Sequence, residues 1–279
     1  MKFSTILFAF VVLPFMGLSQ NGDTLAVKKI DKPVRSVFES TWLIDNPTSV
    51  TNIKGTLEFD IQHRFGVIKS GNKDLLGIWA PSNIRLGFSY SISDRITLGF
   101  GTTKDNRLQD FNLKVGILRQ TRSGKIPLSI TYYGDMAIDA RDAEYFTKSS
   151  DRYSYFNQLL ISRKFSEALS LQVAPSFSHY NSIDSTLTSN NQFAVAIGGR
   201  IKISENTSIL VDYSQPFGQN SNNPGLSLGI EMSTGSHAFQ VFVGNYNGIV
   251  PQKNYMWNQN KLSDRQFLIG FNISRLWNF

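Results

Sequence analysis

Apolar and polar residues alternate along most of the chain, and the pattern is clearest at its end. Residues 266–279 place their apolar side chains on one parity: Phe267, Ile269, Phe271, Ile273, Trp277 and Phe279. The other parity holds mostly small or polar residues: Gln266, Gly270, Asn272 and Ser274. Successive side chains of a strand point to opposite faces. The pattern therefore predicts a closing strand with one apolar and one polar face.

The same period of two recurs upstream and gives twelve candidate strands in all. The other eleven cover residues 54–65, 83–92, 96–101, 110–117, 126–138, 153–165, 169–180, 193–203, 207–215, 226–232 and 238–245. Most have about ten residues, which is the length that crosses a membrane at a tilt. Strands of soluble proteins are typically nearer five or six residues. We found no helical period of useful length.

The connections between these strands fall into two alternating sets. One set is short throughout: residues 93–94, 121–125, 166–168, 204–205 and 234–236. The other set is mostly long: residues 66–82, 103–108, 139–152, 181–191, 216–225 and 247–264. Outer-membrane barrels have short periplasmic turns and longer external loops. We therefore predict an all-β fold, a single antiparallel transmembrane β-barrel of about twelve strands over residues 53–279.

The N-terminus has the features of a secretory signal peptide. Lys2 precedes an apolar run from Phe3 to Leu18, and Ser19 completes a cleavage site with small residues. We expect a signal peptide over residues 1–19, with Gln20 as the new N-terminus; the alternative is a retained anchor. No other long apolar run occurs, so membrane insertion must use a barrel. The predicted location is the outer membrane.

The amino-acid composition excludes several classes of partner and cofactor. Charged residues make up 18% of the chain and aromatic residues 13%, as expected of a β protein that faces lipid. The formal charge of +7 comes without a Lys/Arg cluster of the nucleic-acid-binding type, so we predict no nucleic acid partner. The absence of Cys excludes disulfides and Cys-based metal sites. We predict no cofactor.

Three stretches resemble a known family. They are Pro33–Trp42, Gly55–Gly66 and Ala80–Phe88. They are similar to an uncharacterised outer-membrane β-barrel family of Bacteroidota, a domain of unknown function. The resemblance implies an outer-membrane barrel in contact with lipid, and it implies no reaction, ligand or active-site residue.

The closing strand adds a second resemblance. In outer-membrane barrels the last strand closes the barrel, and the assembly machinery recognises it. By this resemblance Phe271, Trp277 and Phe279 form the assembly signal, and the barrel-assembly machinery is a partner. We expect removal of Phe279 to impair assembly.

The two faces of each strand can be assigned from the cost of charge in lipid. An Arg or Lys near the middle of a bilayer costs about 2–4 kcal/mol, so the apolar parity must face outward and the polar parity inward. The predicted inward charges are Glu58, Asp60, Arg64, Arg85, Asp110, Lys114, Asp135, Lys164, Arg200, Lys202, Asp212 and Glu231. Six are acidic and six basic, whereas a selective pore is skewed toward one sign. Either they pair across strands and partly fill the interior, which we favour, or they line a weakly selective pore.

Glycine is frequent on the same inward parity. The positions are Gly87, Gly99, Gly101, Gly116, Gly198, Gly229, Gly244 and Gly270. One explanation is barrel curvature. The other is space for an insert, either a small ligand or a plug. The N-terminal extension, residues 20–52, contains an apolar island, Phe38–Ile44, that could supply such a plug.

The sequence offers little support for catalysis or metal binding. His63 and His179 fall on the outward parity, as in outer-membrane phospholipase, but the strand after His63 has no outward Ser to serve as nucleophile. We predict that the protein is not an enzyme. An acidic group near an external loop contains Asp135, Asp139, Asp142 and Glu144. Arg141 lies within it, so we expect a solvated loop rather than a metal site.

One external loop is rich in aromatic residues: Tyr246, Tyr255 and Trp257. These could stack on sugar rings, but they are more typical of an interfacial loop. The leading hypothesis for the whole chain is a passive channel or carrier for a small polar solute. The alternative is a largely closed barrel with a structural or surface-binding role. A lipid hydrolase comes third.

Overall fold

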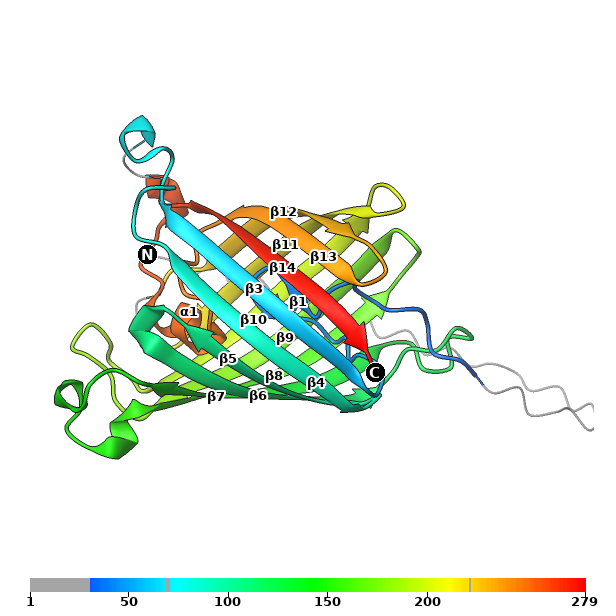
Figure 1. Ribbon diagram of the computed structural model, residues 1–279, viewed down its shortest axis with the longest axis horizontal. Coiled ribbons are helices and arrows are strands. Elements are labelled where there is room, and N and C mark those ends of the chain that lie inside the picture. The colour runs from blue at the N-terminus through cyan, green and yellow to red at the C-terminus, as the bar shows by residue number, and fades with distance from the viewer. Residues whose placement is uncertain (1–30, 69–70, 221) are drawn as a thin grey trace, which may run out of the picture. The chain divides into compact units, whose positions relative to one another are not determined.

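The computed structural model describes residues 31–68, 71–220 and 222–279. The predicted signal peptide, residues 1–19, and the first part of the predicted extension lie outside the described residues. Twelve strands of the described chain form a closed antiparallel barrel (Figure 1), which confirms the predicted fold class. They are β3 (Thr56–Val67), β4 (Asn83–Ser93), β5 (Ile96–Thr103), β6 (Leu108–Leu118), β7 (Ser129–Asp139), β8 (Tyr153–Lys164), β9 (Leu169–Tyr180), β10 (Asn191–Lys202), β11 (Thr207–Phe217), β12 (Gly225–Ser233), β13 (His237–Gly244) and β14 (Leu268–Asn278).

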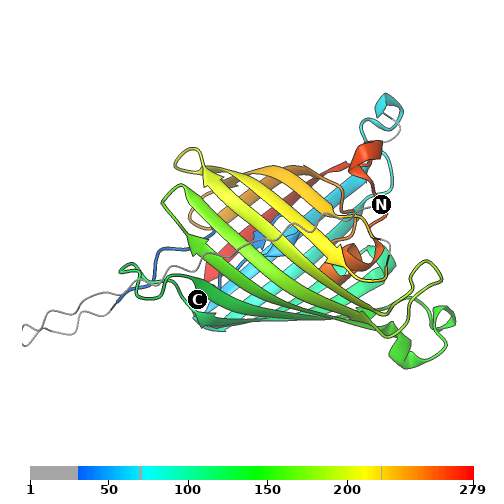
Figure 2. The same ribbon diagram turned by 180° about the vertical axis from the view of Figure 1, so that it is seen from behind.

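Closure comes from pairing of the first and last barrel strands. β14 lies beside β3 (Figure 1), and its register pairs Phe271 with His63 and Ser274 with Asp60. Every other strand pairs with its neighbours in sequence, and the view from behind shows the wall to be continuous (Figure 2). A closed barrel has no unpaired strand edge, so all ladder groups can be satisfied within the wall.

The two ends of the barrel differ in the length of their connections. The turn end carries residues 94–95, 119–128, 165–168, 203–206 and 234–236. The loop end carries residues 68–82, 104–107, 140–152, 181–190, 218–224 and 245–267. One turn is longer than the sequence predicts, because β7 begins at Ser129 rather than at Ile126. Pro127 lacks the N–H that a strand needs, which explains the later start.

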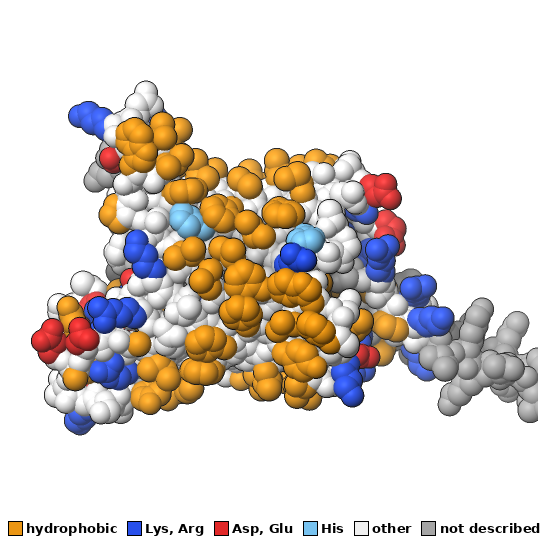
Figure 3. All heavy atoms as spheres, in the orientation of Figure 1, with side chains coloured by type: hydrophobic (Ala, Val, Ile, Leu, Met, Phe, Trp, Pro, Cys, Tyr) orange, Lys and Arg blue, Asp and Glu red, His pale blue; other side chains and the backbone are white. Residues whose placement is uncertain are grey.

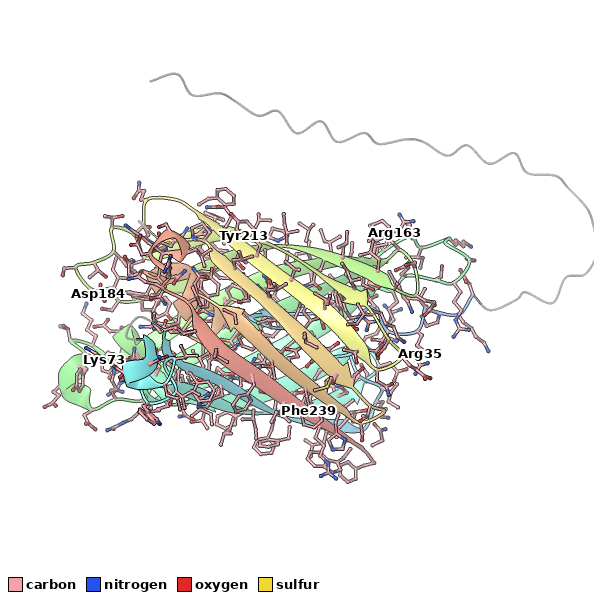
Figure 4. The ribbon with its side chains drawn as sticks, turned by 90° about the horizontal axis from the view of Figure 1, so that it is seen from above. Arg35, Lys73, Arg163, Asp184, Tyr213 and Phe239 are labelled. Atoms are coloured by element: carbon pink, nitrogen blue, oxygen red, sulfur yellow. The ribbon has the colours of Figure 1, made fainter. Side chains whose placement is uncertain are left out.

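Apolar side chains cover the outside of the wall. Phe88, Phe193 and Leu228 are each at least half exposed. Figure 3 shows a broad apolar surface over the strands, with most charged side chains toward the two ends. Figure 4 labels Arg35 at the turn end and Lys73 and Asp184 at the loop end. The alternating pattern therefore assigns the outward face correctly.

The helices of the described chain are short and lie in the connections between strands. The connection 245–267 contains α1 (Pro251–Trp257), which the sequence pattern did not predict. Pro251 suits the first turn of a helix because its φ is fixed and its missing N–H would be unpaired there. In the described part of the chain, five 3₁₀ turns lie in the connections: Gly71–Asp74, Asp105–Arg107, Ala143–Tyr145, Ser149–Arg152 and Leu262–Asp264. Among the described residues, no helix combines the length and apolar character needed to cross a bilayer.

The barrel interior is filled by the chain itself. Residues 36–52, which we call the lumen segment, contain a small hairpin of β1 (Trp42–Leu43) and β2 (Asn46–Pro47). Its turn holds Ile44 at φ 59°, a left-handed conformation that is unfavourable for a β-branched residue. The surroundings must therefore hold this turn in place.

Candidate functional site

The lumen segment packs on an apolar seat inside the barrel. Trp42, Leu43 and Ile44 are 8%, 1% and 0% exposed. The rings of Trp42 and Tyr133 pack in a T-shaped arrangement with 6.2 Å between centroids. The three side chains belong to two clusters of buried residues. The wall residues of these clusters, which we call the seat, are Tyr133, Phe156, Leu160, Ala174, Ala194, Ala196, Leu210 and Phe242. The barrel interior is thus partly apolar.

Sequence reasoning missed this seat. It assigned the inward parity as polar, yet Tyr133, Phe156, Leu160, Leu210 and Phe242 all lie on that parity and are buried. The available signal was the irregularity of residues 153–165, where two Leu residues are adjacent. Apolar residues on both parities of a strand indicate that both faces are covered.

Two inward glycines make room for the segment. A Cβ atom at Gly198 would overlap Cδ2 of Leu43, and one at Gly229 would lie 3.3 Å from Cδ1 of Ile44. Gly87 and Gly101 serve another purpose, because a Cβ at either would overlap the guanidinium of Arg85. Close approach therefore explains these inward glycines, alongside any contribution to curvature.

A buried polar network also holds the lumen segment. The carboxylate of Asp212 accepts hydrogen bonds from the backbone N–H groups of Asp45 and Asn46, both at 3.0 Å, and from Nδ2 of Asn46 at 2.8 Å. Asp45 in turn forms an ion pair with Arg64 at 3.0 Å and accepts a hydrogen bond from Ser227 at 2.5 Å. The hairpin turn is therefore bound to β3, β11 and β12.

Further contacts reach other strands. Thr41 donates to Glu58 at 2.6 Å, and Nζ of Lys114 donates to the carbonyl of Thr41 at 3.1 Å. Nε2 of Gln172, on β9, donates to the carbonyl of Pro47 at 2.8 Å. The segment is therefore held by strands on opposite sides of the barrel.

The turn end of the segment has a contact of its own. Arg200 of β10 donates to Glu39 at 2.9 Å. The Arg200 side chain is 2% exposed, whereas that of Glu39 is 35% exposed. This ion pair marks the place where the segment reaches the opening of the barrel.

Helix α1 enters the lumen from the loop end. Gln252 donates to Asp135 at 2.8 Å, and the ring of Tyr255 stacks on Phe156 with centroids 5.6 Å apart. The Tyr255 hydroxyl donates to Oδ1 of Asn46. Burial raises the pKa of Tyr255, so its phenol stays neutral and can donate. The helix therefore meets the lumen segment directly.

Cavities lie on both sides of this filling. At the loop end, a cavity of about 630 Å³ is bounded by Asn83, Asn247 and Trp257, among others. At the turn end, cavities of about 260 Å³ and about 350 Å³ flank the lumen segment. The cavity beside Trp42 is only about 20 Å³, which is close to the volume of one water. The lumen segment borders the turn-end cavities and helix α1 borders the loop-end cavity, so the two together lie between two vestibules.

The predicted inward charges fall into two groups. Lys164 and Lys202 line the cavity of about 260 Å³ at the turn end and are only partly buried. The other ten are buried within the wall: six acidic (Glu58, Asp60, Asp110, Asp135, Asp212 and Glu231) and four basic (Arg64, Arg85, Lys114 and Arg200). The buried wall charges are therefore skewed toward acid, unlike the equal numbers counted from the sequence.

The three histidines lie on or near the outer surface. The His63 ring stacks on Phe271 with centroids 5.0 Å apart, and its Nδ1 has no hydrogen-bond partner in the described part of the chain. Nδ1 of His179 lies 2.7 Å from Oδ1 of Asn191. Nδ1 of His237 lies 3.1 Å from Oγ of its neighbour in sequence, Ser236.

The acidic group near the loop end is divided. Asp135 faces the lumen, whereas Asp139 pairs with Arg141 at 2.6 Å and Asp142 with Arg107 at 3.5 Å. No cluster of three His, Cys, Asp or Glu residues suited to a metal ion occurs in residues 31–68, 71–220 and 222–279.

The aromatic loop is also divided. Tyr246 and Tyr255 point into the barrel and are 3% and 1% exposed. Trp257 is only partly buried, packs its ring against Tyr180 and donates to Asp184 at 3.0 Å. Of the three, Trp257 alone therefore remains available for an interfacial or ligand-stacking role.

The three residues predicted to form the assembly signal lie on or just after β14. Phe271 faces outward, and Trp277 lies beneath the Arg275 guanidinium at 4.8 Å. The Phe279 side chain is 85% exposed, while its N–H donates to the carbonyl of Gly55 at 3.1 Å. The terminal residue thus joins the end of the chain to the start of β3.

Residues 38–277 match the family model described as "Membrane bound beta barrel domain (DUF5777)". The match covers nearly the whole chain, so the protein belongs to this family of membrane-bound β-barrels. A comparison with curated proteins gives no match.

Similar solved structures include a porin, an outer membrane channel and an outer membrane protein. The KdgM porin aligns with a TM-score of 0.49 and 10% identity, over 79% of this chain and 98% of its own. The COG4313 outer membrane channel from Pseudomonas putida F1 gives 0.49 and 10%, over 82% and 97%. Omp33 of Acinetobacter baumannii gives 0.43 and 10%, over 82% and 100%. At this level of similarity they carry no conclusion about solute or mechanism.

Proposed function

We propose that the protein is an outer-membrane channel that its own lumen segment closes at rest. A small polar solute passes only when this segment leaves the lumen. The observation that supports the proposal is that the segment, together with helix α1, fills the lumen between two vestibules and contacts wall strands on opposite sides. Because the segment is no part of the strand ladder of the wall, it can move without breaking that ladder.

The energetics favour the closed state. Burial of a large apolar side chain contributes about 1.5–3 kcal/mol, and three such side chains sit on the seat. The polar network adds further hydrogen bonds. The open state is therefore rare until an interaction outside the lumen offsets this cost.

The same seat supports the alternative, a permanently closed barrel with a structural or surface-binding role. A permanent plug also explains why Trp42, Leu43 and Ile44 are so well buried. The two functions predict different outcomes when the contacts between the lumen segment and the seat are removed. A channel opens, whereas a permanently closed barrel collapses onto the space or stays closed.

Single-channel recording in planar bilayers tests the proposal. The unseated variant carries Trp42→Ala, Leu43→Ala, Ile44→Ala and Asn46→Ala in the mature chain. We expect rare openings from the native protein and a steady conductance from this variant. Ile53→Ala is the matched control, because Ile53 is 61% exposed and lies outside the seat. A folded but silent unseated variant would support the closed barrel instead.

The proposed location is the outer membrane of a Gram-negative cell, as the family resemblance to Bacteroidota proteins implies. The loop end then faces outside and the turn end faces the periplasm. The partners are outer-membrane lipid around the apolar belt and the barrel-assembly machinery during insertion. The proposal assigns no catalytic step to the protein.

A further inference from the structure

We infer that the open lumen passes cations in preference to anions, so that the solute of this channel is a small cation or a positively charged polar molecule. The inference rests on the proposed function, because it concerns the wall after the lumen segment has left. Its basis is the sign and the pairing of the wall charges, together with the aromatic rings beside them.

The excess of negative charge lies between the two rims of the barrel. Apart from Asp139 at the end of β7, the buried wall carries six acidic and four basic side chains. At the turn end, Lys164 pairs with Glu167 at 2.8 Å. At the loop end, Asp139 pairs with Arg141 at 2.6 Å. These two rim pairs carry no net charge, and a solute meets the acidic excess in the middle part of the lumen.

The pairing of these charges decides which of them a solute meets. Arg85 binds Asp60 at 2.7 Å and Asp110 at 2.6 Å, and all three are wall residues that stay paired in an open barrel. Asp135 and Asp212 are different. Their hydrogen-bond donors come from α1 and from the lumen segment, and neither forms a salt bridge within the described residues.

Departure of the lumen segment also frees basic groups of the wall. Arg64 loses its ion pair with Asp45, and Arg200 loses its ion pair with Glu39. The segment takes these two carboxylates out of the lumen, and it carries no basic residue of its own.

The sign of the open wall is still negative. The ten buried charges between the rims belong to the strands and stay in place, so six carboxylates face four basic groups. The removal of the segment exposes Asp212 and Glu58, whose donors Asn46 and Thr41 depart with it. In a confined, low-dielectric pore such an excess of carboxylates concentrates cations.

Aromatic rings add to the same preference. Trp42 covers Tyr133 in the closed state, and this cover leaves with the segment. The face of an aromatic ring attracts cations. Lys114 already places Nζ 6.0 Å from the centre of the Tyr133 ring, which shows that a cation fits beside it.

The test measures the reversal potential of the unseated variant across a steep KCl gradient. We expect permeability to K⁺ to exceed that to Cl⁻ by roughly threefold or more. Adding Asp135→Asn and Asp212→Asn to this variant leaves four acidic and four basic wall charges. The permeability ratio should then fall toward one. The matched control adds Asp142→Asn and Asp264→Asn, which remove two exposed loop carboxylates.

The outcomes separate the two proposals. A conducting unseated variant with equal permeability or with anion preference overturns this inference and leaves the channel function standing. A folded variant that never conducts overturns the channel function, and this inference with it. Equal loss of selectivity in the loop control would also overturn the inference, because the wall carboxylates would then not be its cause.

Discussion

At the scale of single residues, Arg85 is the most strongly connected charge of the wall. Its side chain is 4% exposed and binds two carboxylates, with two glycines leaving space for it. A buried cation between two carboxylates offsets their desolvation, and its removal leaves both of them unpaired. Its surface counterpart is Arg107, which pairs with Asp142 while both side chains are about two-thirds exposed.

We expect Arg85→Gln to lower the free energy of unfolding by about 3–5 kcal/mol, because two buried carboxylates lose their partner. Arg107→Gln should change it by less than about 1 kcal/mol, because an exposed ion pair is screened by water. Urea titration of the barrel in lipid vesicles measures both. A similar cost for the two variants would contradict the assignment of Arg85 as the centre of a wall network.

Gly198 provides a second residue-scale prediction. A side chain there would meet Leu43, which is 1% exposed and closely packed. We expect Gly198→Val to displace the lumen segment and to raise the frequency of channel openings by about tenfold or more, since overpacking costs about 1–3 kcal/mol. Gly235→Val, in the turn between β12 and β13, is the control, because no atom lies within 4 Å of a Cβ there. Equal effects at the two glycines in bilayer recordings would argue against a specific seat.

At the scale of elements, the lumen segment differs from every strand of the wall. Its hydrogen bonds run mostly to side chains of the wall and not along a ladder. Its position is therefore set by specific wall residues. The strands of the wall instead depend on backbone pairing that any sequence of suitable parity can make.

Cysteine labelling tests the position of the segment. The chain has no Cys, so a single introduced thiol is unique. We expect Ile44→Cys to resist a polar maleimide in the folded barrel, because Ile44 is 0% exposed, and Ile53→Cys to react fast, because Ile53 is 61% exposed. Both should react after unfolding. Comparable rates in the folded protein would place the segment outside the lumen.

The strands could be predicted from sequence, whereas the filling of the lumen could not. A period of two needs only local parity, which residues such as Leu57, Phe59 and Ile61 make plain. The seat depends on long-range contacts, such as that between Asn46 and Asp212. Helix α1 was missed because its seven residues are too few to show a period. The acidic excess of the buried wall arises because Lys164 and Lys202 lie at the rim. Alternation shows which face of a strand a residue lies on, but not how deep in the barrel it lies, so this excess could not be predicted.

At the scale of the whole molecule, the barrel closes where the last strand meets the first. The N–H of Phe279 donates to Gly55, and Oγ1 of Thr56 donates to Asn278 at 2.7 Å. Gly55 has φ 84°, and a Cβ there would lie 2.6 Å from the Phe279 carbonyl oxygen, so the junction requires glycine. The aromatic ring of Phe279 takes little part in this junction, because it is 85% exposed.

This exposure separates a folding role of Phe279 from a recognition role. Deletion of Phe279 removes one terminal hydrogen bond, worth about 1 kcal/mol, and almost no buried apolar area. We therefore expect the truncated chain to refold in detergent with normal heat-modifiable migration on a gel, yet to accumulate poorly in the outer membrane of cells. Phe279→Ala, which keeps the backbone hydrogen bond, should fail in cells to the same degree. Normal insertion of both variants would show that the assembly machinery does not require this side chain. Failure of the truncated chain to refold in detergent would mean that the junction itself, through its backbone contacts, is needed to close the barrel.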